Sequence, residues 1–163
     1  MWEEPPRLDD QVCFAMHAAC RALDGVYRRE LAGLGLTYPQ YLLMLALWER
    51  PHADGHAPTV KQLGSALRLD SGTLSPLLKR LEAAGLVRRE RDRLDERSVR
   101  VVLTSAGSAL RERAGRVPAR IFAATGLTET EVRGLRRLLD RIATSADAAV
   151  LSFADATAEG PAG

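Results

Sequence analysis

Cysteine, long apolar runs and clustered metal ligands are all scarce in this chain, and each scarcity excludes a class of protein. The 163 residues include two cysteines, too few for a disulfide-stabilised fold or a zinc site. His52 and His56 share a loop without further ligands, so surface histidines explain them better than a metal site. No apolar stretch approaches the roughly 20 residues that cross a bilayer, and the N-terminus does not resemble a signal peptide. We expect a cytoplasmic protein without cofactors or metals.

Charge of either sign is nearly balanced overall, but it is unevenly distributed. The net charge is +2, whereas residues 60–103 alone carry an excess of four basic residues. A local basic excess favours a polyanionic partner such as nucleic acid, and a merely solvated surface is the alternative interpretation.

The N-terminal third predicts two helices. Apolar residues recur at three- and four-residue steps from about residue 9 to 32, which indicates a long amphipathic helix that Gly33 and Gly35 end. The sequence Thr-Tyr-Pro-Gln at 37–40 is typical of a capping box, and the apolar residues after it predict a buried second helix.

Two short helices and a hairpin come next. A capping box at Thr59 begins the first short helix, and Asp70 or Ser71 caps the second, whose leucines form one stripe. Residues 86–91 and 98–103 are strand-like and are joined by a charged tip, which predicts a β-hairpin.

The C-terminal third predicts two more helices. Thr104 caps the first of them, in which Pro118 predicts a kink or a break. A third capping box at Thr128 begins the last helix, whose apolar residues form a short heptad seam and therefore require a partner helix.

These elements predict a mainly α fold with a small β-hairpin wing. It is a winged helix-turn-helix in which the N- and C-terminal helices form a dimerisation region. The expected divisions are a flexible N-terminus at 1–8, a helical dimerisation region at 9–50 and 104–152, a DNA-binding region at 51–103 and a disordered tail at 153–163.

The leucine-backed helix and the hairpin tip carry the expected DNA contacts. A helix fits the major groove, and an arginine on a narrow tip can enter the minor groove. We expect an ion pair with Asp95 to hold Arg97 in position. The predicted partner is double-stranded operator DNA, and the predicted contact residues are Ser71, Thr73, Ser75, Lys79, Arg80, Arg93, Asp95 and Arg97.

Four motifs resemble the MarR family of transcription regulators. They are Leu-Asp-Asp-Gln-Val-Cys-Phe at 8–14, Leu-Thr-Tyr-Pro-Gln-Tyr at 36–41, Leu-Asp-Ser-Gly-Thr-Leu-Ser-Pro-Leu-Leu-Lys-Arg at 69–80 and Asp-Glu-Arg-Ser-Val at 95–99. The first two are similar to the organic hydroperoxide resistance branch of that family. This resemblance implies a homodimer in which Cys13 is oxidised, while Tyr27 and Tyr38 of the partner subunit bond its sulfur.

Spacing along the helix agrees with a sensor that spans two chains. Cys13 and Tyr27 are fourteen residues apart, which is roughly 21 Å at about 1.5 Å per residue, so they do not touch within one chain. One turn after Cys13 this chain has His17 where the branch usually carries an aromatic residue. A surface histidine is the expected interpretation.

The second cysteine, Cys20, decides how oxidised Cys13 is resolved. The two lie about 10.5 Å apart along a helix, beyond the ~7 Å limit for a disulfide. We expect Cys13 to form a sulfenic acid and then a mixed disulfide with a small cellular thiol, with organic hydroperoxide as the oxidant. Cys20 is expected to be a packing residue, and a disulfide between subunits is the alternative.

The sequence therefore predicts a repressor that binds operator DNA when reduced and releases it when Cys13 is oxidised. One alternative is a MarR-type repressor released by a small aromatic ligand in the dimer cleft, with Cys13 incidental. The other is an enzyme, a thiol peroxidase that uses Cys13 as its catalyst.

Overall fold

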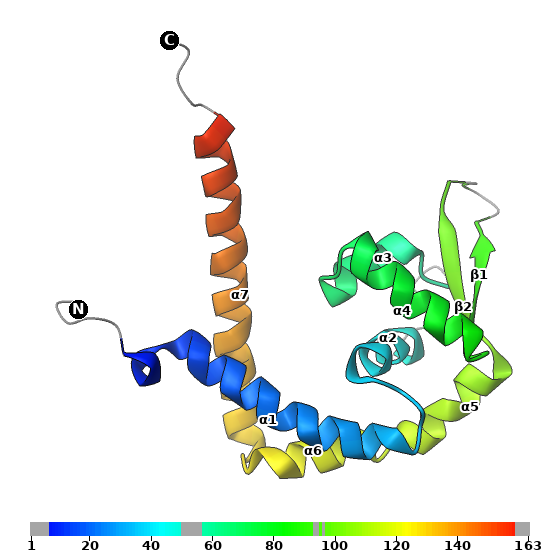
Figure 1. Ribbon diagram of the computed structural model, residues 1–163, viewed down its shortest axis with the longest axis horizontal. Helices are drawn as coiled ribbons and strands as arrows, with labels where there is room; N and C mark the ends of the chain where they lie inside the picture. The colour runs from blue at the N-terminus through cyan, green and yellow to red at the C-terminus, as the bar shows by residue number, and fades with distance from the viewer. Residues whose placement is uncertain (1–6, 50–56, 93–94, 96, 159–163) are drawn as a thin grey trace. The chain divides into compact units, whose positions relative to one another are not determined.

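The structure is a computed structural model that describes residues 7–49, 57–92, 95 and 97–158, with side chains described up to residue 152. The chain divides into two compact units, residues 1–124 and 125–163. Figure 1 shows the elements in order. They are a 3₁₀ turn Leu8–Asp10, α1 Val12–Ala32, α2 Tyr38–Trp48, α3 Val60–Leu67, α4 Ser71–Ala83, β1 Val87–Arg91, β2 Val99–Leu103, α5 Ser105–Ala114, α6 Val117–Thr125 and α7 Glu129–Ala158.

Side chains at the helix N-termini satisfy backbone groups that the helix leaves unpaired, as the sequence predicted. The backbone N–H of Thr37 donates to Oε1 of Gln40 at 2.8 Å, and that of Thr59 donates to Oε1 of Gln62 at 2.8 Å. The N–H of Thr128 donates to Glu131 in the same way. All three capping boxes are confirmed, and each fixes where its helix begins.

Two further caps follow the same principle. Asp70, rather than Ser71, caps α4, because its Oδ1 accepts from the N–H of Thr73 at 2.7 Å. Hydrogen bonds from Thr73 lower the pKa of this carboxyl, so it is a charged cap near neutral pH. Thr104 caps α5 through the N–H of Gly107.

Two predicted helix ends were wrong, and one predicted break is confirmed. Helix α1 begins at Val12 instead of residue 9, after the separate 3₁₀ turn. The helix expected after Thr104 is interrupted at residues 115–116, and Pro118 sits in the first turn of α6, where a proline costs no hydrogen bond. Helix α7 continues to Ala158, beyond residue 152, because an alanine-rich sequence without glycine or proline runs on from Leu135 to Glu159.

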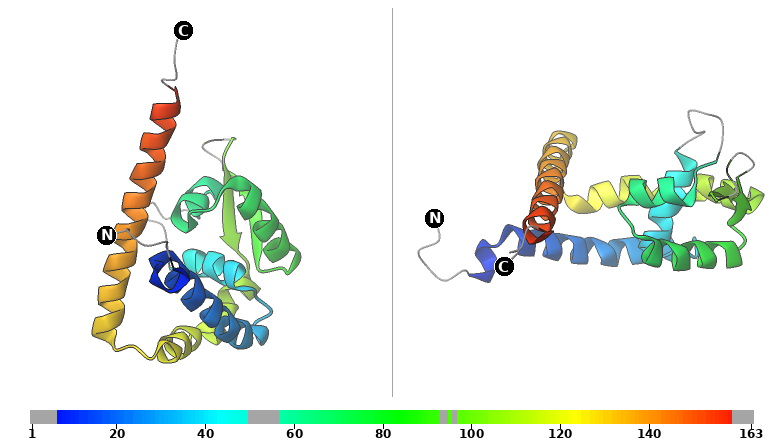
Figure 2. Two further views of the ribbon diagram at one scale, coloured as in Figure 1. Left: turned by 60° about the vertical axis from the view of Figure 1, so that its left-hand side comes forward. Right: turned by 90° about the horizontal axis from the view of Figure 1, so that it is seen from above.

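Helix α2 lies at the centre of the first unit and contacts α1, α3, α4 and α5 (Figures 1 and 2). It is almost wholly apolar, so it buries side chains on all sides. The fully buried side chains around it join the helices to the hairpin in one core: Leu31, Tyr41, Leu43, Met44, Leu63, Leu74, Leu78, Leu81, Val87 and Val101.

The start of α5 is packed tightly against the base of the hairpin. The indole Nε1 of Trp48 donates to the carbonyl of Gly107 at 2.9 Å, in a buried contact between α2 and α5. The hydroxyl of Thr104 donates to the carbonyl of Gly85 at 2.6 Å. A Cβ at Gly107 would overlap the backbone carbonyl of Leu86, so only glycine fits there.

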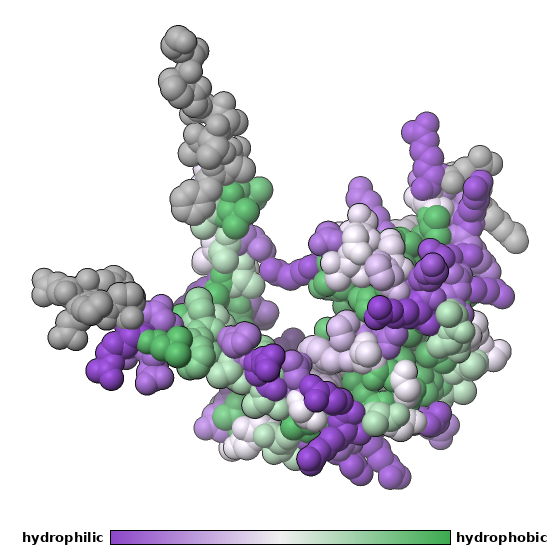
Figure 3. Space-filling model, viewed as in Figure 1, coloured by the Kyte–Doolittle hydropathy of each residue, from purple (hydrophilic) through white to green (hydrophobic). Residues whose placement is uncertain are grey.

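The second unit contains α7, which leaves a row of apolar side chains uncovered. Figure 3 shows apolar surface along the described part of this helix. The exposed large apolar residues are Leu135, Leu138, Leu139, Ile142, Val150 and Leu151. Within the described ranges no helix is both long and apolar enough to cross a membrane.

Replacing Gly107 by alanine tests the packing at this junction. The added Cβ forces the backbone of α5 away from Leu86, and we expect G107A to lower the free energy of unfolding by about 3 kcal/mol. The midpoint of thermal unfolding should fall by roughly 10 °C, measured by circular dichroism at fixed protein concentration. The matched control is G33A, since Gly33 has helical dihedral angles and open space around its Cβ position. Equal melting temperatures for the two variants would contradict the packing argument.

Candidate DNA interface and cysteine sensor

The helix-turn-helix is formed by α3, a three-residue turn and α4. Arg68 closes α3 in the left-handed region, with φ of 53°. The N–H of Leu69 then donates to the carbonyl of Gly64 at 2.9 Å. Gly64 is buried, and a Cβ there would come to 3.0 Å from the carbonyl of Leu69. This close approach holds α4 at a fixed angle to α3.

Helix α4 has one buried and one exposed face. Its leucines Leu74, Leu77, Leu78 and Leu81 face the core. Five of the predicted DNA contacts are exposed on the rest of this helix: Ser71, Thr73, Ser75, Lys79 and Arg80. The face is short, polar and basic at its C-terminal half, which suits entry into a major groove.

The wing is an antiparallel pair in which Val87 lies opposite Leu103 and Arg91 lies opposite Val99. Three hydrogen bonds connect its first strand, β1, to α4. The backbone N–H, Nε and a terminal guanidinium nitrogen of Arg89 donate to the Glu82 carboxylate at 3.0, 2.9 and 2.7 Å. These bonds lower the pKa of Glu82, so the carboxylate stays charged as the partner of Arg89.

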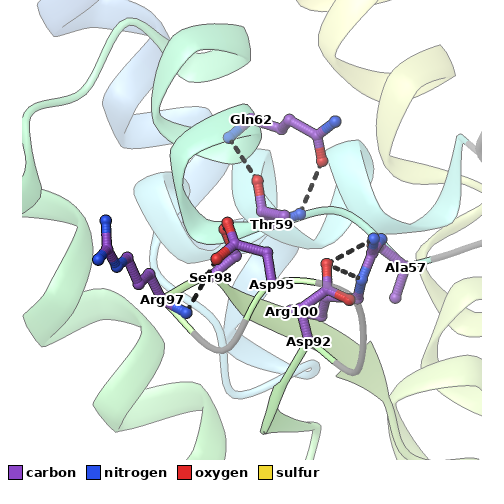
Figure 4. A network of polar contacts seen from close by, with 8 residues as sticks. All are labelled: Ala57, Thr59, Gln62, Asp92, Asp95, Arg97, Ser98 and Arg100. Atoms are coloured by element: carbon purple, nitrogen blue, oxygen red, sulfur yellow. Dashed lines mark hydrogen bonds and ion pairs between the residues drawn. The ribbon is translucent and has the colours of Figure 1, made fainter.

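At the wing tip, which the structure describes at Asp92, Asp95 and residues 97–98, the predicted ion pair between Asp95 and Arg97 was wrong. Asp95 accepts instead from the backbone N–H of Arg97 at 3.0 Å and from the hydroxyl of Ser98 at 2.7 Å (Figure 4). A short Asp side chain reaches the N–H two residues on more readily than a guanidinium does, as in many turns. The Arg97 side chain is exposed and points away from Asp95. Arg93 lies outside the described residues.

An open cavity of about 400 Å³ lies between the wing and the helix-turn-helix. It brings together Ser75 of α4 and Arg97 of the tip, both predicted contacts. Two further basic residues line it, Lys61 of α3 and Arg89 of β1, to which the sequence analysis assigned no individual role. In the sequence, these two residues could be noticed only as part of the basic excess of residues 60–103. The fold shows that they line the same cavity as the predicted DNA contacts Ser75 and Arg97.

The structure brings together two of the three predicted sensor residues. The rings of Tyr27, on α1, and Tyr38, at the start of α2, have centroids 4.2 Å apart. Cys13 is exposed in the first turn of α1. Because α1 is one continuous helix, Cys13 and Tyr27 of the same chain are roughly 21 Å apart. A contact between the sulfur and these tyrosines needs a second chain.

The tyrosine pair continues into the core as a row of aromatic rings. The centroids of Tyr27 and Tyr41 are 6.1 Å apart, and Tyr41 meets Trp48 edge to face at 6.4 Å. Burial raises the pKa of Tyr27 to about 12, with additional contributions from Tyr38 and Tyr41. Burial also raises the pKa of Tyr38 and of Tyr41. All three hydroxyls therefore keep their protons near neutral pH and can donate hydrogen bonds.

Cys20 is exposed in this chain, so the packing role expected for it is not met within one subunit and stays a prediction. Burial is the largest cause of the raised pKa of Tyr38, and the electrostatic interaction with Cys20 is the second largest. An open cavity of about 490 Å³ lies against Tyr38 and Asp24. His17 is exposed on α1, as expected. Among the described side chains, no group of three or more His, Cys, Asp or Glu could hold a metal ion.

Comparisons with known proteins agree with this architecture. The family model for the transcriptional regulator SarA/Rot matches residues 27–113, which cover the tyrosine pair, the helix-turn-helix and the wing. The HTH-type transcriptional regulator TtmR of Methylorubrum extorquens is 48% identical over 145 residues, which are 89% of this chain and 70% of that protein. The organic hydroperoxide resistance transcriptional regulator of Bacillus subtilis is 41% identical over 138 residues, 85% of this chain and 88% of that protein.

A solved structure extends the agreement to three dimensions. Reduced AbfR of Staphylococcus epidermidis, bound to DNA, is 33% identical, with a TM-score of 0.69 over 85% of this chain and 94% of that one. AbfR has also been solved overoxidized on DNA and in a disulfide-formed state. The chain therefore belongs to the SarA/Rot family of MarR-like winged-helix transcriptional regulators and is a homologue of the organic hydroperoxide resistance regulator of Bacillus subtilis.

Proposed function

We propose that this regulator is an organic-hydroperoxide-sensing repressor, which binds operator DNA as a reduced homodimer and releases it when Cys13 is oxidised. The observation that carries the proposal is the placement of the sensor groups. An exposed thiol lies at one end of α1, and a preformed pair of protonated hydroxyls, Tyr27 and Tyr38, lies toward the other. A second copy of α1 that crosses the first places each thiol against the other chain's hydroxyls.

The surroundings of Cys13 support its role as a nucleophile. It is the second residue of α1, where the helix presents its first backbone N–H groups, and the side chain of Gln11 does not cap them. Such N–H groups and the helix dipole interact favourably with a negative sulfur. Phenolic O–H groups of the partner's tyrosines add hydrogen bonds to the thiolate. In the proposed dimer, these groups would interact with the thiolate, which is the form of cysteine that reacts with peroxides.

The chemistry that we propose is a two-electron oxidation of the sulfur. The thiolate attacks the terminal oxygen of the hydroperoxide, the O–O bond breaks, and the alkoxide leaves and takes a proton to become an alcohol. The resulting sulfenic acid condenses with a small cellular thiol, which forms a mixed disulfide and releases water. Because overoxidized AbfR was crystallised on DNA, we assign release in this chain to the bulkier mixed disulfide.

The apolar surfaces of α1 and α7 support a homodimer. Leu8, Val12 and Phe14 near the start of α1 are exposed, as is the row on α7. On each of these helices, exposed large apolar side chains of this kind mark an interface. In the dimer, the two α4 helices would enter successive major grooves roughly 34 Å apart. A repressor of this kind acts in the cytoplasm, where its operator is.

Helix α4 and the wing would divide the recognition of DNA between them. We assign Ser71, Thr73 and Ser75 to base edges and phosphates at the N-terminal end of α4, and Lys79 and Arg80 to phosphates. Arg97 reaches the minor groove from the wing. A bulky group at Cys13 would change the distance between the two copies of α4, and a loss of about 1.4 kcal/mol in contacts lowers affinity tenfold.

The first prediction concerns the phosphate contact of Lys79. We expect K79A to weaken binding to operator and to unrelated DNA by similar factors, and to reduce the slope of log affinity against log salt by about one. Fluorescence anisotropy over a salt series measures both quantities. The control is R133A, since Arg133 pairs with Glu129 on exposed α7. An unchanged salt slope in K79A would remove this residue from the interface.

The second prediction concerns the thiol. With an organic hydroperoxide and a small thiol present, we expect wild-type affinity for operator to fall at least about tenfold, while C13S keeps its affinity. Gel-shift titration measures this, and C20S, which removes the other exposed thiol of α1, should respond like the wild type. If C13S still leaves DNA on oxidation, the thiol mechanism is wrong.

The two alternative functions give different results in the same assays. A repressor governed by an aromatic ligand would ignore the hydroperoxide and leave DNA when that ligand is added. A thiol peroxidase would consume hydroperoxide steadily with a reductant, whereas a sensor consumes one equivalent per site before reduction.

The third prediction uses the three tyrosines, which are all in the aromatic row. Because their pKa values are raised in the native protein, the native state ionises above the unfolded state's value of about 10. The resulting stability is complete below about pH 10 and is lost as the pH rises toward about 12. Tyrosinate absorbance in the near ultraviolet at pH near 10 should be well below that of the protein in urea. Equal absorbance would contradict the buried cluster.

A further inference from the structure

A buried carboxylate lies where the wing strands end. Asp92 directly follows β1, and its side chain is 8% exposed. Its Oδ2 accepts from Nε of Arg100 at 2.8 Å and from a terminal nitrogen of the same guanidinium at 2.7 Å. Arg100 itself has an exposed side-chain fraction of 18%. The pair is therefore shielded from water, unlike the exposed Arg88–Glu90 pair on the same hairpin.

Arg100 also connects the wing to the start of the helix-turn-helix. Its other terminal nitrogen donates to the carbonyl of Ala57 at 2.6 Å. The next residue, Val101, donates its backbone N–H to Pro58 at 2.8 Å, and Thr59 forms a β-bridge with Arg100. Thr59 is the N-cap of α3 (Figure 4). Strand β2 and residues 57–59, directly before α3, are thus held together by side-chain and backbone bonds.

In the other direction, Asp92 connects to the wing tip. Its backbone N–H donates to the carbonyl of Ser98 at 2.9 Å. The Ser98 hydroxyl donates to Asp95, which also accepts from the backbone N–H of Arg97. A continuous series of hydrogen bonds therefore runs from Ala57 through Arg100, Asp92, Ser98 and Asp95 to the backbone of Arg97. Figure 4 shows the side chains at both ends of this series.

The energetics of such a pair indicate that it orients neighbouring groups rather than adding stability. Burial of two opposite charges costs desolvation energy that their attraction often only offsets, so a buried pair contributes little net stability compared with apolar residues. Removal of one partner leaves the other charge buried and unpaired. The pair does fix an orientation. The planar guanidinium of Arg100 binds the Asp92 carboxylate and the carbonyl of Ala57 at once, so these two groups are held in fixed positions relative to each other.

We propose that Asp92 and Arg100 are positioning residues that fix the wing tip relative to the helix-turn-helix, so that Arg97 reaches the minor groove when α4 occupies the major groove. The proposal rests on the proposed contact of Arg97 with DNA. Without the pair, the tip can still form, but its orientation relative to α3 is no longer fixed, and the arginine spends less time in the groove.

A double-mutant cycle tests the proposal. We expect R97A, D92N and R100K each to weaken operator binding about tenfold. R100K keeps the positive charge but loses the paired bonds to Asp92 and the bond to Ala57. The double variants D92N/R97A and R100K/R97A should bind no more weakly than R97A alone, because the pair acts through Arg97. E90Q, which removes the exposed pair on the same hairpin, is the matched control and should bind like the wild type.

Footprinting separates positioning from loss of fold. In D92N and R100K, protection of the minor groove from hydroxyl radicals should be lost at the flanks of the operator, while protection of guanine N7 in the major groove stays. Loss in both grooves, or additive effects in the cycle, would overturn the proposal. If D92N does not fold by circular dichroism, R100K decides alone. If R97A binds like the wild type, the proposed contact of Arg97 fails first, whereas normal binding by D92N and R100K beside a weakened R97A refutes only the positioning role.

Discussion

The burial of α2 is the constraint on which the rest of the structure depends. This helix is apolar on nearly every side, so it must be enclosed, and α1, α3, α4 and α5 enclose it. Its N-terminal end presents Tyr38 to Tyr27, and its C-terminal end presents Trp48 to Gly107. Gly107 in turn is pressed against Leu86, directly before the wing. One helix therefore contacts the proposed sensor directly and, through Gly107, the base of the element proposed to read the minor groove.

This arrangement suggests how a change at the sensor would reach DNA. Packed cores have few alternative arrangements, so a displaced element moves its neighbours rather than deforming gradually. The tyrosine rings, Tyr41 and Trp48 form an unbroken row through the core. In each DNA-binding region, the Arg89–Glu82 pair joins the wing to α4, and Arg100, which Asp92 holds, joins the wing to the carbonyl of Ala57 before α3. The helix-turn-helix and the wing of one subunit would then move as one rigid body. Oxidation at the sensor would change the distance between the two DNA-binding regions of the dimer.

Much of the fold could be predicted from sequence because local rules determined it. Capping boxes located three helix starts to the residue, and the leucine stripe of α4 identified its buried face. The features that were missed depend on partners distant in sequence or on choices between nearby groups. Arg100 binds a carbonyl 43 residues away, which no periodicity indicates. Asp95 bonds the backbone of Arg97 rather than its guanidinium.

The length of α1 has a consequence for dimers formed from two different variants of the chain. Because the thiol lies in the first turn of α1 and the hydroxyl pair lies toward the other end of that helix, each proposed sensor takes its sulfur from one chain and its donors from the other. A homodimer of chains without the thiol, or of chains without the hydroxyls, would bind operator but would not respond to hydroperoxide. In a mixed pair, one sensor loses both parts and the other regains both. A purified mixed dimer of the two variants would then regain one peroxide-responsive sensor, which neither homodimer has.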